Sequence, residues 1–463
     1  MRRNANKTLG KNGFLLEKLP EKPYLLRTFS SCPEYIGRMK YFGTDGIRRH
    51  ASFFNDVFLS KFAAAVASLP SCKRVVIGRD TRPSGREIER TLALLLSSYG
   101  VETVIAGILP SPALAICVRE YACSYGIMVT ASHNPPCDNG LKVFSAIGAK
   151  LSKAEEVFLE ERLSSPRFLP YKKTDVLLMD GPKTYFDHLL TTHAFDLSGK
   201  RILLDCAYGA ASDLAAPLFR AFGAEVVAVC DEKTGEKINV DCGATHPERL
   251  FDLSSRFDLA FSYDGDADRV LVVKKGKLLT GDDILYCLSL AEKEKGLLHN
   301  NTVCGTVMTN SGVEKAFNDK GIDFYRSDVG DRELYEKMLE KDVFNGAETS
   351  GHVLLRRYGN TGDGIMTSLL FAALDKENEV DIDLLPPKIP AVEATLPVTE
   401  KEKERFLSAQ KNGFCLPSFP HVRTVIRASG TENKIRFLCE AETIETCKNV
   451  LTVLQDKVKE MFS

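Results

Sequence analysis

The sequence lacks the features that mark several large classes of protein. No apolar run approaches the roughly 20 residues of a membrane-spanning helix, so we expect no membrane insertion. Positive charge is not in excess, and the net charge of −1 argues against a broad nucleic-acid surface. The thirteen cysteines include no CxxC pair. Their odd number and scatter favour reduced thiols in a cytoplasmic protein over a disulfide framework or a zinc site.

The first 38 residues differ from the rest of the chain. They carry eight Lys or Arg against three Asp or Glu, a local net charge of +5, and show no sustained periodicity. Their longest apolar run, FLL, is too short for a secretory signal. Two interpretations stay open: a disordered basic extension, or translated sequence upstream of a true start at Met39. In either case residues 1–38 are excluded from the expected fold.

Beyond residue 38, short apolar runs alternate with helical patterns. RVVIGRD, GREIERTLALLLSSYG and VETVIAGI, within residues 74–108, indicate a strand, a helix and a strand. The same order recurs from residue 200, with a helix expected over 210–223, and again from residue 301. This recurrence is typical of βαβ units around largely parallel sheets. The C-terminal residues instead indicate a hairpin followed by an amphipathic helix.

We therefore predict three α/β domains with mixed, largely parallel sheets and a small C-terminal α+β domain, arranged around a central cleft. A length of 463 residues is in keeping with several domains. The expected boundaries place domain 1 at 39–190, domain 2 at 191–296, domain 3 at 297–392 and domain 4 at 393–463.

Four polar loops carry candidate chemistry. The first, VTASHNPPCDNGLKVFS at 129–145, presents the hydroxyl of Ser132 with acid or base partners at His133 and Lys142. A hydrolase elbow does not fit, because TASHNP lacks the flanking glycines. A helix cap is the structural alternative for this serine. The remaining interpretation is a phosphoryl carrier, which needs a divalent cation and a phosphate-binding group nearby.

The second loop, SYDGDADRV at 262–270, alternates three carboxylates at Asp264, Asp266 and Asp268. Carboxylates this close repel one another unless a cation is present, and their hard oxygens suit Mg²⁺ or Ca²⁺. An EF-hand does not fit, because Arg269 stands where that loop needs glycine. Arg269 instead indicates an anionic substrate. An acidic, solvated turn is the alternative interpretation.

The third loop, NGAETSGHVLL at 345–355, alternates Glu348, Ser350 and His352. In an extended segment their side chains would share one face and would suit the hydroxyls of a sugar. A polar loop that bends at Gly351 explains the same pattern.

The fourth loop, IRASGTENKIR at 426–436, surrounds Gly430 with two guanidiniums and two hydroxyls, which suit a phosphate dianion. These groups belong to Arg427, Ser429, Thr431 and Arg436. A common SGT turn is the alternative. Together the four loops predict phosphoryl transfer on a phosphosugar.

TASHNP, DGDADR, GAETSGH and RASGTENKIR, in this order, resemble the four signature loops of the α-D-phosphohexomutase superfamily. The resemblance extends from about Met39 to the C-terminus. MKYFGTDGIR at 39–48, VGDREL at 329–334 and TGDGIMTSLL at 361–370 resemble the bacterial phosphoglucosamine mutase branch more than the phosphomannomutase/phosphoglucomutase branch.

The resemblance implies an intramolecular phosphotransferase that interconverts glucosamine 6-phosphate and glucosamine 1-phosphate through a bisphosphorylated sugar, supplying UDP-N-acetylglucosamine synthesis. Ser132 would carry the phosphoryl group, after priming by a kinase or by a bisphosphorylated sugar. One Mg²⁺ per subunit would be bound by the seryl phosphate together with Asp264, Asp266 and Asp268. Lys142 would be the general acid/base.

The resemblance assigns the remaining site residues as well. Arg48, His133 and Arg269 would line the reaction centre, with Arg48 neutralising developing charge. Glu348 and Ser350 would hold the sugar hydroxyls, with His352 close by. The non-reacting phosphate would be held by Arg427, Ser429, Gly430, Thr431 and Arg436. The expected partner is a small phosphosugar, bound by a monomer or a homodimer.

Five positions depart from the family pattern: Ala347, Thr349, Ala428, Asn433 and Tyr208. None of them removes a charged or nucleophilic group. Thr349 adjoins the sugar-binding residues, so activity on glucose or mannose phosphates stays open. The alternative functions are a phosphomannomutase/phosphoglucomutase, a phosphatase with Asp264 as nucleophile, and a non-catalytic phosphosugar sensor.

Overall fold

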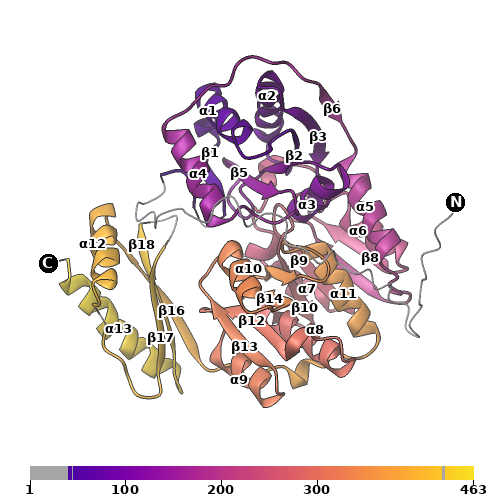
Figure 1. Ribbon diagram of the computed structural model, residues 1–463. Helices are drawn as coiled ribbons and strands as arrows, with labels where there is room; N and C mark the ends of the chain where they lie inside the picture. Colours follow the sequence, from indigo (N-terminus) through magenta and orange to yellow (C-terminus); the bar gives the residue numbers. More distant parts are fainter. Residues whose placement is uncertain (1–39, 44, 415, 430–432, 463) are drawn as a thin grey trace. The chain divides into compact units, whose positions relative to one another are not determined.

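A computed structural model describes residues 40–43, 45–414, 416–429 and 433–462 (Figure 1). The chain divides into two compact units, each of which is described by itself. Unit 1 contains residues 46–278 and 358–380 with 40–42, and unit 2 contains the other described residues. The expected basic extension, residues 1–38, lies outside the described residues, and so do Gly430 and Thr431 of the fourth loop.

The first sheet of unit 1 has six strands in the order β1-β5-β4-β2-β3-β6. Strands β2, β3, β4 and β6 are parallel, and β5 and β1 continue the sheet in antiparallel pairing. The strands are β1 (Ile47–His50), β2 (Arg74–Arg79), β3 (Glu102–Ile108), β4 (Tyr125–Val129), β5 (Asp138–Ser145) and β6 (Val176–Leu178). The helices are α1 (Asp56–Ala67), α2 (Gly85–Ser98), α3 (Ser111–Glu120), α4 (Lys153–Ser164) and α5 (Gly181–Thr192). The strand, helix and strand predicted within residues 74–108 are confirmed.

The second sheet of unit 1 has the order β11-β10-β9-β7-β8 and is again mixed. The strands are β7 (Arg201–Asp205), β8 (Glu225–Val229), β9 (Leu259–Tyr263), β10 (Val270–Lys274) and β11 (Lys277–Leu279). Its helices are α6 (Ala215–Ala221), α7 (Arg249–Ser254) and α11 (Gly364–Lys376). The helix predicted over 210–223 is therefore shorter than expected. Helix α11 comes from far along the chain and packs on β9 and β10.

Unit 2 holds two further sheets, in the orders β13-β12-β14-β15 and β16-β18-β17. The first sheet is mixed and the second is antiparallel. The strands are β12 (Thr302–Thr306), β13 (Asp323–Ser327), β14 (Asn345–Ala347), β15 (Val353–Leu355), β16 (Ala391–Pro397), β17 (Arg423–Ala428) and β18 (Lys434–Glu440). The helices are α8 (Gly281–Glu294), α9 (Ser311–Asp319), α10 (Asp331–Glu340), α12 (Glu400–Lys411) and α13 (Ile444–Glu460).

Local sequence explains how these elements place the polar loops. All five residues of β4 are buried because β4 lies inside its sheet, between β5 and β2. All five residues of β9 are buried as well, between β10 and β7. Strand β4 is an apolar run, and β9 is apolar apart from Ser262. A polar loop follows each strand at its carboxyl end, where α/β folds bind ligands. Short 3-10 helices form at Ala51–Phe53, Gly235–Lys237, Gly243–Thr245, His299–Asn301 and Ile382–Leu384.

The predicted fold class is confirmed in its main features: the sheets are mixed and largely parallel, and the C-terminal residues form an antiparallel α+β layer with the predicted hairpin β17–β18 and helix α13. Among the described helices, none combines the length and apolar content that crossing a bilayer requires.

Candidate active site

The serine loop, residues 130–138, follows β4 in unit 1 and brings Ser132 to the aspartates. The Ser132 side chain is fully buried, and its Oγ donates a hydrogen bond to Oδ2 of Asp264 at 2.6 Å. Its backbone N–H donates to Oγ1 of Thr130 at 2.8 Å. The φ angle of Ser132 is +50°, in the left-handed region that most residues avoid. Such an outlier marks a backbone that its surroundings hold in place.

Arg82, in the turn after β2, holds the serine loop in this conformation. Its side chain is 1% exposed, and Nε donates to Oδ2 of Asp80 at 3.0 Å. The guanidinium donates to four backbone carbonyls of the loop, those of Ser132, Asn134, Pro135 and Asp138. Asn239 adds a further donor, with Nδ2 2.8 Å from the carbonyl oxygen of Ser132. A buried Arg with this many acceptors is fixed in one geometry.

Sequence reasoning missed Arg82 and Asn239. The available signal for Arg82 was the DTR turn directly after an apolar strand, because an Asp and an Arg two residues apart can pair in such a turn. The sequence offers no comparable signal for Asn239, which lies more than 100 residues from the carbonyl group that it contacts.

The aspartate loop, residues 264–269, follows β9 and gathers the three predicted carboxylates. Asp264, Asp266 and Asp268 are all buried, and one oxygen from each lies within 4.8 Å of the others. Burial, followed by repulsion from Asp268 and Asp266, raises the pKa of Asp264 to about 8. The backbone of Gly265 passes so close to Ser132 that an added Cβ would lie 2.6 Å from the Ser132 carbonyl oxygen.

These carboxylates fit a hard divalent cation. Among the described residues, Oδ1 of the buried Asp266 has no hydrogen-bond partner. A buried carboxylate oxygen without a partner is costly unless a cation approaches it. The donors are all oxygens, and the raised pKa of Asp264 reflects the negative charge that a cation would balance. The loop can therefore hold a hard divalent cation.

Lys142 lies in the same cluster. It is on β5, is 1% exposed, and donates through Nζ to Oδ2 of Asp266 at 2.7 Å and Oδ2 of Asp268 at 2.9 Å. The ammonium thus contacts two of the carboxylates that a cation would bind. The structure brings Ser132 and Lys142 next to the three aspartates, although more than 120 residues separate the aspartates from Ser132 and from Lys142 in the sequence.

His133, Arg48 and Arg269 lie around this cluster. Burial, followed by the positive charges of Arg269 and Arg48, lowers the pKa of His133 to about 3, so its imidazole is neutral near pH 7. Arg48 Nη1 is 3.5 Å from Oδ1 of Asn134 in the serine loop. The backbone N–H of Arg269 donates to Oδ1 of Asp264 at 3.3 Å, and its Nε is 3.9 Å from Oδ1 of Asp268.

The third loop, in unit 2, differs from the expected extended segment. Strands β14 and β15 pair antiparallel, and residues 348–352 form the turn between them, closed by Glu348 N–H donating to His352 O at 2.9 Å. Glu348 and His352 are buried whereas Ser350 is exposed, and the alternative interpretation, a polar loop that bends at Gly351, is confirmed. The physical reason is Gly351, whose φ of +96° reverses the chain.

Two polar contacts fix this turn. Oε1 of Glu348 accepts the N–H of Gly330 at 2.9 Å, and Nδ1 of His352 lies 3.6 Å from Oδ2 of Asp331. Thr349, which departs from the family pattern, donates through Oγ1 to Oδ2 of Asp282 on α8 at 2.8 Å. Burial raises the pKa of Asp282 to about 6. Thr349 therefore serves to anchor the turn.

The fourth loop joins β17 and β18. Arg427 and Arg436 are directly opposed in the antiparallel register, and Ser429 N–H donates to Lys434 O at 2.9 Å. Burial, followed by the charge of Arg436, lowers the pKa of Arg427. Two positive side chains directly opposite one another in a sheet repel each other, whereas an anion bound by both makes their proximity favourable. Electrostatic attraction also links Arg427 to Glu348 of the third loop.

Comparison with known proteins agrees with this geometry. Residues 39–169 match the model of the phosphoglucomutase/phosphomannomutase alpha/beta/alpha domain I, and residues 280–386 match that of domain III. A phosphoglucosamine mutase of Nautilia profundicola is 38% identical over 448 residues, which cover 92% of this chain and 100% of the relative.

Solved structures share the fold. A phosphoglucomutase/phosphomannomutase family protein of Burkholderia thailandensis is 22% identical, with a TM-score of 0.74 over 90% of this chain and 97% of that one. An Aspergillus fumigatus N-acetylphosphoglucosamine mutase, solved with GlcNAc-6P and magnesium, is 16% identical, with a TM-score of 0.62 over 92% and 96% of the two chains. The solved structures therefore share the fold of this chain, and the 38% identity to the Nautilia enzyme over 92% of the chain establishes that it belongs to the phosphoglucosamine mutase family of phosphohexomutases.

Proposed function

We propose that this protein interconverts glucosamine 6-phosphate and glucosamine 1-phosphate, using Ser132 as the phosphoryl carrier. The observation that carries this proposal is the contact of the buried Ser132 hydroxyl with Asp264, inside a cluster of three carboxylates and one lysine. A phosphoryl group on Oγ would lie beside a divalent cation and shielded from water, as transfer to a sugar rather than to water requires.

Asp264, Asp266 and Asp268 would hold one Mg²⁺ together with the phosphoryl oxygens on Ser132. The cation would supply charge neutralisation for the phosphoryl group in transfer. Arg48 and Arg269 would add positive charge around the same group. Neutral His133 would contribute a hydrogen bond rather than a charge, as the lowered pKa of its imidazole supports.

Lys142 would move the proton of the reacting sugar hydroxyl. In the present arrangement its ammonium contacts Asp266 and Asp268. The same oxygens would hold Mg²⁺, so Nζ of Lys142 would be available to the substrate in the loaded site. This coupling of cation binding to an acid/base group is a direct result of shared carboxylates.

Glu348 and Ser350 would bind the sugar hydroxyls, with His352 supporting their turn. Arg427, Ser429, Gly430, Thr431 and Arg436 would hold the phosphate that is not reacting. A bisphosphorylated sugar or a kinase would prime Ser132. We also retain the four-domain division, a cytoplasmic location and a monomeric or homodimeric state as proposals that accompany this function.

The test is a coupled assay with Mg²⁺ on glucosamine, glucose and mannose phosphates, run on the wild type and on Ser132→Ala. We expect strong preference for glucosamine phosphate, loss of turnover in Ser132→Ala by several orders of magnitude, and loss on chelation. Ser145→Ala is the matched control, because its Oγ donates only to a backbone carbonyl, that of Ala149. Intact-mass measurement would show a phosphoryl group on the wild type and none on Ser132→Ala.

The other outcomes separate the alternatives. Comparable turnover of the three sugars would keep the mutase chemistry and reject the assigned substrate. Release of inorganic phosphate that survives Ser132→Ala would support the phosphatase. Binding without turnover after priming would support the sensor.

A further inference from the structure

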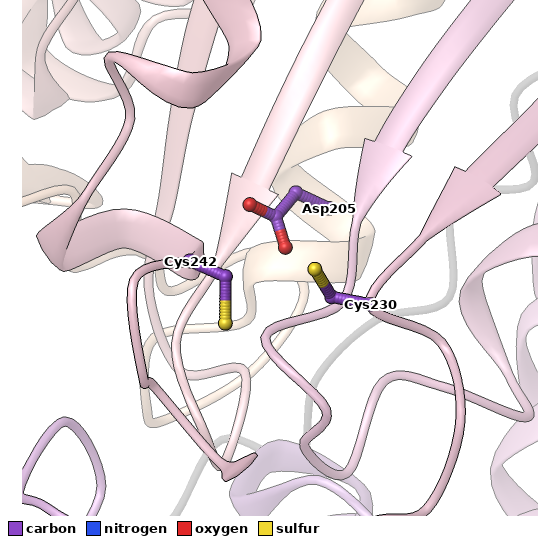
Figure 2. A group of neighbouring side chains, drawn as sticks. All are labelled: Asp205, Cys230 and Cys242. Carbon is purple, nitrogen blue, oxygen red and sulfur yellow. The ribbon is translucent and has the colours of Figure 1, made fainter.

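A second group of side chains with metal-binding chemistry lies in unit 1, at the carboxyl ends of β7 and β8 (Figure 2). Asp205 is the last residue of β7, Cys230 directly follows β8, and Cys242 precedes the 3-10 turn Gly243–Thr245. One ligand atom from each of the three lies within 4.8 Å of the others. All three residues are buried, Asp205 and Cys242 fully so.

The carboxylate of Asp205 is already oriented. Its Oδ1 accepts the N–H of Ala207 at 3.0 Å, and its Oδ2 accepts the N–H of Gly243 at 2.8 Å. Each carboxylate oxygen keeps a further lone pair for a cation. Carboxylates that bind metals are commonly held by such outer hydrogen bonds. Burial raises the pKa of Asp205, as expected for a carboxylate that has no strong counter-charge in contact.

The two thiols lie next to each other, because their Sγ atoms belong to the group of ligand atoms that all fall within 4.8 Å of one another. The guanidinium of Arg249 is near enough to act electrostatically on all three groups. Two thiolates and one carboxylate around a divalent cation leave a single net negative charge, which Arg249 would balance.

We propose that Cys230, Cys242 and Asp205 form a binding site for one thiophilic divalent cation, for which Zn²⁺ is the best match. Thiolate ligands select Zn²⁺ over the Mg²⁺ that suits the aspartate loop. Three protein ligands fill three positions of a tetrahedral site, and water takes the fourth. A Cys230–Cys242 disulfide would use only two of the three groups and would give the oriented carboxylate of Asp205 no ligand to bind.

The site would act on the serine loop through Asn239. This residue lies between the two cysteines in the chain, and its Nδ2 donates to the carbonyl oxygens of Ser132 and Asn134 at 2.8 and 3.2 Å. A cation bound at Cys230 and Cys242 would close residues 230–242 into a loop and reduce their freedom. A bound ion would therefore stabilise the conformation that presents Ser132.

The test uses the full-length protein, reduced with a phosphine, stripped with a chelator and then saturated with Mg²⁺. Titration with Co²⁺ should give one equivalent of a species with a thiolate-to-cobalt charge-transfer band and the visible bands of tetrahedral Co²⁺, both bleached by Zn²⁺. Cys230→Ser and Cys242→Ser should each remove the charge-transfer band. Cys439→Ser and Cys447→Ser are matched controls, because these two buried thiols also contact each other but belong to none of the described ligand clusters.

X-ray absorption on the Zn²⁺-loaded wild type gives a measurement that does not depend on variants that fold poorly. It should show two sulfur ligands at about 2.3 Å. The proposal is overturned if the wild type gives no stoichiometric band, or if the band survives in both Cys230→Ser and Cys242→Ser. It is equally overturned if the freshly isolated protein is lighter by two hydrogens and that difference disappears in Cys230→Ser, which would identify a disulfide.

Discussion

At the scale of single residues, Arg82 is the side chain on which the serine loop most depends. Replacing it with Gln removes the charge that faces buried Asp80 and most of the donors to the loop carbonyls. We expect a loss of about 3–5 kcal/mol in the free energy of unfolding, because one partner of a buried pair is left uncompensated. Denaturant unfolding measures this loss, and turnover should fall more than the affinity for substrate.

Arg74→Gln is the matched control for Arg82→Gln. Arg74 also pairs with a carboxylate, that of Glu102, through Nε at 2.7 Å, but the two side chains are 29% and 44% exposed. Its loss should cost about 1 kcal/mol or less. Equal effects of the two substitutions would show that the contacts to the serine loop contribute nothing.

Also at this scale, the raised pKa of Asp264 makes Mg²⁺ binding dependent on pH. Without a cation the folded state keeps a proton on Asp264 up to about pH 8, whereas the unfolded chain releases it near pH 4. The folded state therefore binds more protons in this window, and the free energy of unfolding falls as pH rises. Mg²⁺ must displace that proton, so its affinity should rise by up to about tenfold per pH unit between pH 6 and 8.

The measurement is the increase in Tm on adding Mg²⁺ at pH 6, 7 and 8. We expect the increase to grow with pH in the wild type. In Asp264→Asn it should be small and independent of pH. An increase that stays constant with pH in the wild type would contradict the assignment of the proton to Asp264.

At the scale of elements, the start of α11 fixes the aspartate loop. The N–H of Gly364 donates to Ala267 O at 3.0 Å, and an added Cβ would lie 2.5 Å from Arg269 O. Gly364→Ala should therefore cost about 1–3 kcal/mol of unfolding free energy and weaken Mg²⁺ binding, because the loop must shift. Gly359→Ala is the control, since the nearest atom to its added Cβ is 3.9 Å away. Calorimetric titration with Mg²⁺ measures the affinity of both variants. An unchanged affinity in Gly364→Ala would contradict the expectation.

Elements of this chain are predictable to the extent that they are local. The apolar runs of β2, α2 and β3 predict those elements because each run is bounded by turn residues. For residues 345–355 the sequence left an extended segment and a bend at Gly351 both open, because an alternation of polar residues is compatible with either. The contact of Ser132 with Asp264 was expected only because four loops together required it. The role of Arg82 in holding the serine loop was not predicted, because it depends on backbone carbonyl groups of that loop and no sequence pattern indicates where those groups point.

At the scale of the whole molecule, the chain leaves unit 1 after residue 278 and returns to it at 358–380. The apolar sequence of α11 indicates that the helix is buried but not which sheet it packs against. The answer is the sheet of β9, where the ring of Phe371 meets that of Phe261 with centroids 6.4 Å apart. Sequence order alone therefore does not assign a helix to a unit.

Native-state hydrogen exchange should reveal this discontinuity. Amides of α11 should share the opening free energy of β9 and β10, because they belong to one packed unit. Amides of α8, although closer to β10 in the sequence, should instead follow β14 in unit 2. Exchange at low denaturant with residue-level detection tests this expectation. Protection of α11 that follows α8 would show that the chain opens by sequence segment and not by unit.

The left-handed backbone of Ser132 restricts which mutations this chain can accept. A β-branched residue is a severe outlier at a φ of +50°, so Ser132→Thr should be inactive and poorly folded although it keeps a hydroxyl. Glycine suits that φ, so Ser132→Gly should be more stable than Ser132→Ala by about 1 kcal/mol. Position 132 therefore tolerates few changes: threonine keeps the hydroxyl but does not fit the backbone, whereas glycine fits the backbone but has no hydroxyl.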